Sequence, residues 1–167
     1  ELKYQYSAGR HNWFVHSEAA HRAAREGPAL FDLTSFAKCR VEGPDAAKVL
    51  GRVSANHVAG GAGRAVYTQW LNDRGGIEAD LTVTRLAEDA FLVVTSGACQ
   101  VRDFQWRKGH VDDHERCTVT DVTSGHAVIG VTGPRSRDLL ATLMPENLAN
   151  DAFPFGASRE VEFAMAK

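Results

Sequence analysis

The stretch VYTQWLNDRGGIEADLTVTRL, residues 66–86, decides the fold because it contains two strand-like segments joined by a strong turn signal. β-Branched and aromatic residues, which favour strands, are frequent in both segments. The intervening NDRGG, residues 72–76, is rich in the residue types that form turns. The stretch therefore predicts a β-hairpin.

The second half of this hairpin alternates between apolar and polar residues. Successive side chains of a strand point to opposite faces, so one face is expected to be apolar and the other polar. The apolar face carries Ile77, Ala79, Leu81 and Val83, and the polar face carries Glu78, Asp80, Thr82 and Thr84. The pattern alone favours an ordinary solvated role for Asp80. Asp is a poor strand former, however, and local rules are often broken at functional sites, so Asp80 is also a candidate site residue.

The rest of the chain predicts a mixture of helices and strands around this hairpin. After an irregular lead-in at residues 1–16, we expect Ser17 to cap a helix over 18–26. A helix with Ala46, Val49, Leu50 and Val53 on one face follows from their spacing. The remaining expected strands are 36–42, 91–95, 117–122 and 127–132, a further helix covers 99–109, and a last helix carries Leu139, Leu140, Leu143 and Met144.

Two segments of the chain are similar in sequence. VEGPDAAKVL, residues 41–50, resembles VTGPRSRDLL, residues 131–140, at an offset of 131 − 41 = 90 residues. Each segment is typical of a strand, a Gly-Pro turn and an amphipathic helix, which indicates an internal duplication. The alternative is a chance similarity, because Gly-Pro helix starts are also common in unrelated proteins. We therefore predict an α+β fold, with an antiparallel sheet, helices on one side and internally duplicated β-α-β-type halves.

Composition excludes several classes of protein. The formal net charge is −2 and the pI is about 6.4, so nothing indicates nucleic-acid binding. No stretch reaches the roughly 18 apolar residues that span a bilayer, so we expect no membrane association. The cysteines Cys39, Cys99 and Cys117 are odd in number and far apart, which argues against a disulfide framework or a zinc ribbon. A reducing location, cytoplasmic or in the mitochondrial matrix, is expected.

Motifs for common cofactors are missing. The sequence has no Gly-x-Gly-x-x-Gly after a strand, so we expect any FAD to bind in a separate domain. HVDDH, residues 110–114, places two imidazoles four residues apart, which on a helix could hold a metal. The adjacent Gly109 and the two Asp residues favour a solvated polar turn instead, and we predict no metal site.

The hairpin resembles that of the glycine cleavage T-protein (aminomethyltransferase) family, whose turn reads Asn-x-x-Gly-Gly-[Ile/Val]-x-x-Asp-Leu. Every fixed position of this motif is filled in residues 72–81. LFDLTS, residues 30–35, and the two Gly-Pro helix starts also resemble the family, and the similarity spans about residues 18–163. SFAK (35–38), LTVTRL (81–86) and FPFG (153–156) resemble the folate domains fused to dimethylglycine and sarcosine dehydrogenases.

The resemblance implies roles for four residues. The aspartate of the family that matches Asp80 faces the reactive nitrogens of tetrahydrofolate, so Asp80 is the expected catalytic carboxylate. Tyr67 matches a tyrosine that lines the pterin pocket. Thr82 and Thr84 match positions that border the ligand. The expected folate-binding residues are thus Tyr67, Asp80, Thr82 and Thr84.

The resemblance also implies a function for a larger protein. An amine such as dimethylglycine or sarcosine is oxidised at FAD in an upstream domain, and tetrahydrofolate captures the iminium or formaldehyde product as 5,10-methylenetetrahydrofolate. The alternatives are a glycine cleavage T-protein, which takes its aminomethyl group from a lipoylated carrier, and a non-catalytic folate-binding regulatory module. We expect residues 1–167 to be one truncated folate-binding domain, because the family's Tyr-x-Gly-Glu-x-Gly-x-Glu signature is absent from the chain.

Overall fold

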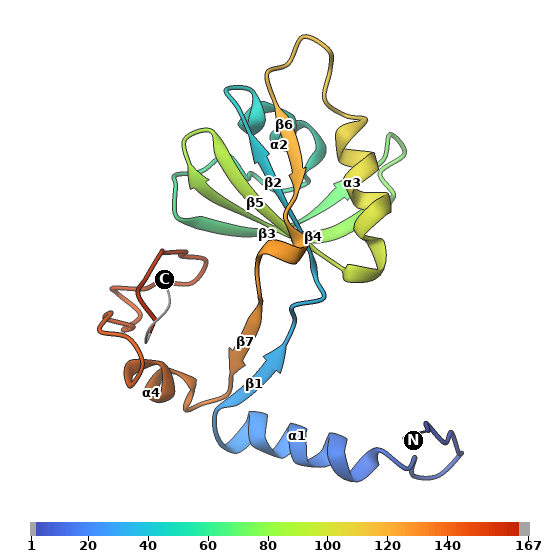
Figure 1. Cartoon of the computed structure of the whole chain (residues 1–167), viewed down its shortest axis with the longest axis vertical. Coiled ribbons are helices and arrows are strands. Elements are labelled where there is room, and N and C mark those ends of the chain that lie inside the picture. The colour runs from blue at the N-terminus through green and yellow to red at the C-terminus, as the bar shows by residue number, and fades with distance from the viewer. Residues whose placement is uncertain (1–2, 164–167) are drawn as a thin grey trace. The chain divides into compact units, whose positions relative to one another are not determined.

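The computed structural model describes residues 3–163 of the chain (Figure 1). Within these residues the chain divides into two compact units. One holds residues 3–32, 129–148 and 161–163, and the other holds Leu33–Val128 and Ala149–Glu160. The expectation of a single truncated domain stays a prediction.

The larger unit is built on a five-stranded antiparallel sheet in the order β3-β4-β5-β2-β6 (Figure 1). Two α-helices and two short 3-10 helices complete it. The bounds are β2 (Ala37–Glu42), α2 (Ala46–Val53), β3 (Arg64–Leu71), β4 (Ile77–Ala87), β5 (Ala90–Thr95), η1 (Gly97–Cys99), α3 (Gln100–Lys108), β6 (Thr118–Asp121) and η2 (Thr123–Gly125).

The core of this unit lies on one face of the sheet. The amphipathic helix α2 buries Ala46, Val49, Leu50 and Val53, the four residues that the sequence pattern selects. Trp106 of α3 stacks on Trp70 of β3, with ring centroids 5.3 Å apart. The strands contribute Val41, Trp70, Ala79, Leu81, Val83, Phe91 and Val93 to the same cluster. Both helices therefore cover the same face, and the prediction of an antiparallel sheet with helices on one side is confirmed for this unit.

The predicted hairpin is present as β3 and β4. Their register pairs Tyr67 with Thr82 and Gln69 with Asp80, and it shifts between Trp70 and Leu71. Ala79, Leu81 and Val83 are buried, as the alternation predicts. Ile77 is exposed instead, because it lies beyond the shift in register, at the end of the turn.

The outer edge of β3 is covered by two separate segments of the chain. At one end, Ala65 N–H donates to Gly156 O and Ser158 N–H donates to Gly63 O, each at 2.8 Å. At the other end, Ala55 N–H donates to Gln69 O at 2.9 Å. These bonds satisfy backbone groups that an edge strand would otherwise leave open, and they hold β3 in place beside β4.

The smaller unit contains a two-stranded antiparallel sheet and two helices. The sheet pairs β1 (Ala29–Asp32) with β7 (Ile129–Thr132), and the helices are α1 (Phe14–Glu26) and α4 (Ser136–Ala141). Neither helix contains a fully buried residue. Because Ser17 N–H donates to Trp13 O at 3.1 Å, Ser17 is already inside α1, and the prediction that it caps the helix is wrong.

The two similar segments, residues 41–50 and 131–140, have the same local structure. β2 leads through Gly43 into α2, and β7 leads through Gly133 into α4. Both glycines have a positive φ, +130° and +98°, a backbone conformation that residues with a side chain rarely adopt. A Cβ at Gly43 would collide with the carbonyl oxygen of Arg116, and one at Gly133 would collide with that of Gly27.

The strand pairing repeats as well. Cys39 of β2 pairs with Asp121 of β6. The position 90 residues after Cys39 is Ile129 of β7, and Ile129 pairs with Asp32 of β1. All four residue pairs of each ladder correspond in this way. The duplication therefore includes strand register and close backbone packing, in addition to four identical residues.

Candidate functional site

The face of the five-stranded sheet opposite α2 and α3 carries all four predicted site residues. Tyr67 projects from β3, and Asp80, Thr82 and Thr84 project from alternate positions of β4. Asp80 is exposed, Tyr67 is 57% exposed, and the two threonines are half-buried. The structure thus brings these residues together on one open surface.

Tyr67 and Asp80 are joined directly. The Tyr67 hydroxyl donates a hydrogen bond to Oδ2 of Asp80. This bond raises the pKa of Tyr67 above its ordinary value, because the phenol proton is held by a carboxylate. Tyr67 consequently remains a protonated donor over the neutral range, and Asp80 is held in a fixed orientation in the middle of β4.

This arrangement has a definite chemical capacity. An exposed carboxylate can accept charge-assisted hydrogen bonds from an amine and can stabilise a positive charge that forms nearby. Tyr67 fixes one carboxylate oxygen by donation, and Thr82, directly opposite Tyr67, adds a hydroxyl to the same surface. The residues present therefore fit a ligand with reactive amine nitrogens.

The sequence patterns did not single out three further residues near the site. Gln69 is opposite Asp80 in the ladder. Asn56, in the loop between α2 and β3, donates from Nδ2 to Tyr67 O at 2.7 Å. The alternation of β3 could have identified Gln69, because Gln69 shares a face with Tyr67 and a hairpin register places it against Asp80. No local pattern indicates Asn56.

Lys38 is the third residue. It lies in the same row of paired residues across the sheet as Tyr67 and Thr82. Its partner on β5 is Val94, and Val94 pairs in turn with Thr82. Lys38 is almost fully buried, and its ammonium donates to the carbonyl oxygens of Thr34 and Phe36, each at 2.8 Å. Lys38 thus fixes the turn that precedes β2 next to the candidate site.

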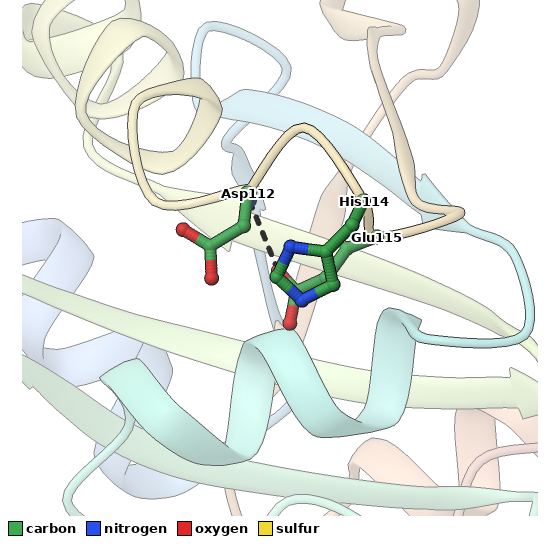
Figure 2. Close-up of side chains that lie close together, drawn as sticks. All are labelled: Asp112, His114 and Glu115. Atoms are coloured by element: carbon green, nitrogen blue, oxygen red, sulfur yellow. Dashed lines mark hydrogen bonds between the residues drawn. The ribbon is translucent and has the colours of Figure 1, made fainter.

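The segment that follows α3 is a polar turn, as predicted from HVDDH. α3 ends at Lys108, so the two histidines do not share a helical face. Asp112, His114 and Glu115 do place ligand atoms within 4.8 Å of one another (Figure 2). Glu115, however, is occupied by Arg52, which donates to both of its oxygens at 2.7 and 2.8 Å, and by Lys48 at 3.1 Å.

These cations stabilise the Glu115 carboxylate strongly. Hydrogen bonds from Arg52, and then from the Asp112 N–H, hold its pKa far below the ordinary range. The bonds connect this turn to α2, which carries both Lys48 and Arg52. The cluster therefore acts as a structural clamp between α2 and the turn.

The fold and the site together define an α+β domain with a one-sided sheet whose open face carries a Tyr–Asp pair on a hairpin. Comparison with known families finds a match to the GCVT N-terminal domain over residues 1–167. The chain belongs to this family, so the family resemblance and the fold predicted from the sequence are confirmed.

Relatives of known activity fall into two groups. The chain is 44% identical over 161 residues to 4-methylaminobutanoate oxidase (formaldehyde-forming) of Paenarthrobacter nicotinovorans, covering 96% of this chain and 19% of that protein. It is 30% identical to mitochondrial sarcosine dehydrogenase of Mus musculus, covering 97% of this chain and 19% of that protein. The chain thus spans about a fifth of the length of these relatives.

A solved structure represents the second group. The crystal structure of glycine cleavage system aminomethyltransferase T from Bartonella henselae matches with a TM-score of 0.69 and 28% identity, covering 84% of this chain and 39% of that one. The chain is therefore related both to demethylating oxidoreductases and to aminomethyltransferases. The roles of Asp80, Tyr67, Thr82 and Thr84 stay predictions.

Proposed function

We propose that this chain binds tetrahydrofolate on the open face of its sheet and serves a larger FAD-dependent demethylating oxidoreductase. In that protein, an iminium or formaldehyde unit from dimethylglycine, sarcosine or a similar N-methyl amine is captured as 5,10-methylenetetrahydrofolate. The observation that carries the proposal is the exposed Asp80 carboxylate held by the Tyr67 hydroxyl on the family's characteristic hairpin.

The residues of the chain have distinct tasks in this proposal. Tetrahydrofolate, when bound, supplies the amine nitrogens that accept the one-carbon unit. Asp80 accepts a hydrogen bond from the amine, stabilises positive charge during the transfer and can take up a proton. Tyr67 keeps the carboxylate oriented by donating to Oδ2. Thr82 and Thr84 border the ligand along the same strand face.

The partner in this proposal is an upstream FAD domain of the same protein. The similarity to 4-methylaminobutanoate oxidase and sarcosine dehydrogenase, each about five times longer than the matched segment, supports this assignment. We place the protein in the cytoplasm, or in the mitochondrial matrix in a eukaryote. Within residues 3–163, no helix is long and apolar enough to cross a membrane.

The test is made on the full-length protein with Asp80→Asn. We expect amine oxidation to continue, because the flavin chemistry takes place in another domain. The yield of 5,10-methylenetetrahydrofolate should fall, and free formaldehyde should rise to match the loss. Asp89→Asn, which changes an exposed carboxylate in the turn between β4 and β5, is the matched control. An unchanged folate yield in Asp80→Asn would contradict the proposal.

The similarity to aminomethyltransferase T supports a second candidate, a stand-alone aminomethyltransferase acting on a lipoylated carrier. The same assay separates the two, because this enzyme would release ammonia from the carrier and would not oxidise an N-methyl amine. The remaining alternative is a folate-binding regulatory module. Such a module would bind folate, but adding folate would not change the product that is formed.

Calorimetric titration of tetrahydrofolate into the isolated chain, under reducing and anaerobic conditions, tests the site itself. Binding that weakens in Asp80→Asn would support a half-site centred on Asp80. If neither protein binds, a version extended past Lys167 is titrated next. Restored binding, weakened again by Asp80→Asn, would support the site, and its absence would argue against the proposed location.

A further inference from the structure

We propose that Arg40 binds the carboxylates of the glutamate tail of tetrahydrofolate on the open face of the sheet. The inference rests on the proposed function and adds a second contact with the same ligand. Tetrahydrofolate carries amine nitrogens in its pterin and carboxylates on its glutamate. A surface that binds the whole molecule is therefore expected to offer a carboxylate to one part and a cation to the other. Asp80 supplies the carboxylate, and Arg40 supplies the cation.

The strand register places Arg40 on the same face as Asp80. Arg40 of β2 pairs with Leu92 of β5, and Leu92 pairs in turn with Thr84 of β4. Paired residues of an antiparallel ladder project to the same face. Thr84 and Asp80 are four residues apart on β4, so their side chains also share a face. Arg40 and Asp80 thus both project from the face opposite α2 and α3.

The separation of the two residues suits the ligand. Spacings of about 3.4 Å per residue along a strand and about 4.8 Å between strands put the Cα atoms of Asp80 and Arg40 roughly 17 Å apart. The aminobenzoyl ring and the glutamate of tetrahydrofolate, met by an extended arginine side chain, cover a span of this order. The half-buried Val94 and Leu92 lie along β5 between the two residues and offer apolar contact to the ring.

Arg40 is the accessible cation of this surface. In the ladders that the structure describes, the open face carries two cationic side chains at paired positions, Lys38 and Arg40. Lys38 is almost fully buried, and its ammonium already donates to two backbone carbonyls. The side chain of Arg40, in contrast, is 38% exposed. A ligand carboxylate that approaches the open face can therefore reach Arg40 but not Lys38.

The guanidinium of Arg40 is oriented but only partly used. Its Nη2 donates to Oε1 of Glu42 at 2.8 Å, and this is the one hydrogen bond of the side chain to a described residue. A guanidinium has five N–H donors in a planar fork, which suits carboxylates. Glu42 thus holds the group in position through one nitrogen, and the second terminal nitrogen, Nη1, can donate to the tail of the ligand.

The test compares two ligands by calorimetry in the full-length protein. One is tetrahydrofolate, and the other is its diamide, in which neutral amides replace both carboxylates of the glutamate. The wild type should bind tetrahydrofolate about three- to tenfold more tightly than the diamide. Arg40→Gln should remove this difference. Asp80→Asn should weaken the binding of both ligands equally, because the pterin is the same in both.

Arg22→Gln is the matched control, since Arg22 is an exposed arginine that pairs with Glu18 on α1. It should keep the preference of the wild type for tetrahydrofolate. Equal affinities of the wild type for the two ligands would overturn the inference, as would an Arg40→Gln protein that keeps the preference or that loses equal affinity for both. In each of these cases the proposed function stands if Asp80→Asn still weakens binding. A wild type that binds neither ligand would overturn both.

A second measurement covers the case in which circular dichroism shows that Arg40→Gln does not fold. Salt screens the attraction between an exposed guanidinium and a carboxylate. Rising salt should therefore bring the affinity of the wild type for tetrahydrofolate down towards that for the diamide. A preference that does not change with salt would overturn the inference. Arg40→Lys, which keeps the charge but not the planar fork, should show a smaller preference than the wild type, and an undiminished one would count against Arg40.

Discussion

At the scale of single residues, the bond from Tyr67 to Asp80 links stability to alkaline pH. The pKa of Tyr67 is raised above its ordinary value of about 10, chiefly by this bond. The folded state therefore holds the phenol proton more tightly than the unfolded state. The resulting stabilisation is complete below about pH 10 and is lost as pH rises through the folded pKa.

Tyr67→Phe tests this linkage. We expect the free energy of unfolding of the variant to depend less steeply on pH above about pH 10 than that of the wild type. Urea unfolding of both proteins at neutral and alkaline pH measures the difference. Because Tyr67 is on the surface, only a small difference is expected at neutral pH, and parallel curves across the whole range would contradict the linkage.

The pKa of Glu115 is shifted in the opposite direction, and it links the stability of the fold to acid pH. Arg52 holds the pKa of Glu115 below its ordinary value of about 4.3, so the folded state favours the carboxylate. The stabilisation is present above that value and is lost as pH falls towards the folded pKa. Glu115→Gln should lose most stability near neutral pH and differ less from the wild type in acid. Unfolding midpoints across the acid range provide the measurement.

The control for this prediction is Glu88→Gln, which alters an exposed carboxylate in the turn between β4 and β5. Its unfolding midpoint should follow that of the wild type at every pH. A Glu115→Gln protein with the same pH profile as Glu88→Gln would show that the contacts with Lys48 and Arg52 do not stabilise the fold.

At the scale of elements, the two strand–turn–helix junctions depend on glycine. Gly43→Ala and Gly133→Ala should each cost about 1–3 kcal/mol from backbone strain alone, with a further cost from collision with a carbonyl oxygen. Gly51→Ala is the control, because Gly51 is within α2, exposed and free of close neighbours. It should stabilise the protein by about 0.5–1 kcal/mol. Chemical denaturation of the three variants measures these effects.

Elements dominated by local patterns could be predicted from the sequence. The hairpin follows from its turn residues, and α2 follows from four apolar residues at helical spacing. The start of α1 could not be predicted, because the helix begins at Phe14, next to a Trp13 ring stacked on His11 at 4.3 Å. The last helix is shorter than its apolar residues suggest, since it ends at Ala141 and Pro145 follows closely.

The candidate site was predictable to the extent that it lies on one hairpin. Asp80 and Tyr67 share a face by alternation and register, so the family motif and the pleat together indicate them. Asn56 and Lys38 act through backbone carbonyls of segments that fold back on the hairpin or precede β2. Their roles depend on tertiary contacts that no local spacing reveals.

At the scale of the whole molecule, burial is unevenly distributed. The apolar cluster that includes Leu50, Trp70 and Phe91 belongs entirely to the larger unit. In the smaller unit, α1 and α4 have no fully buried residue. Backbone amides with little burial around them open at low free energy cost.

Hydrogen exchange measured by mass spectrometry should therefore separate the two units. Amides of β4 and β5 are expected to exchange slowly, whereas those of Phe14–Glu26 should exchange at least about tenfold faster. Peptides from α2 provide an internal reference, since its apolar face is buried. Equal protection of α1 and β5 would contradict this expectation.

The pairing of β1 with β7 has a consequence for the synthesis of the protein. The start of β7 lies 129 − 32 = 97 positions after the end of β1 in the sequence, and the strands of the larger sheet are made in between. At about 5–20 residues per second, the ribosome completes β7 roughly 5–20 s after β1. During that interval β1 has no partner strand and is a target for chaperones or for misassembly with another nascent chain. The speed of translation should therefore influence how much of the protein reaches its native form.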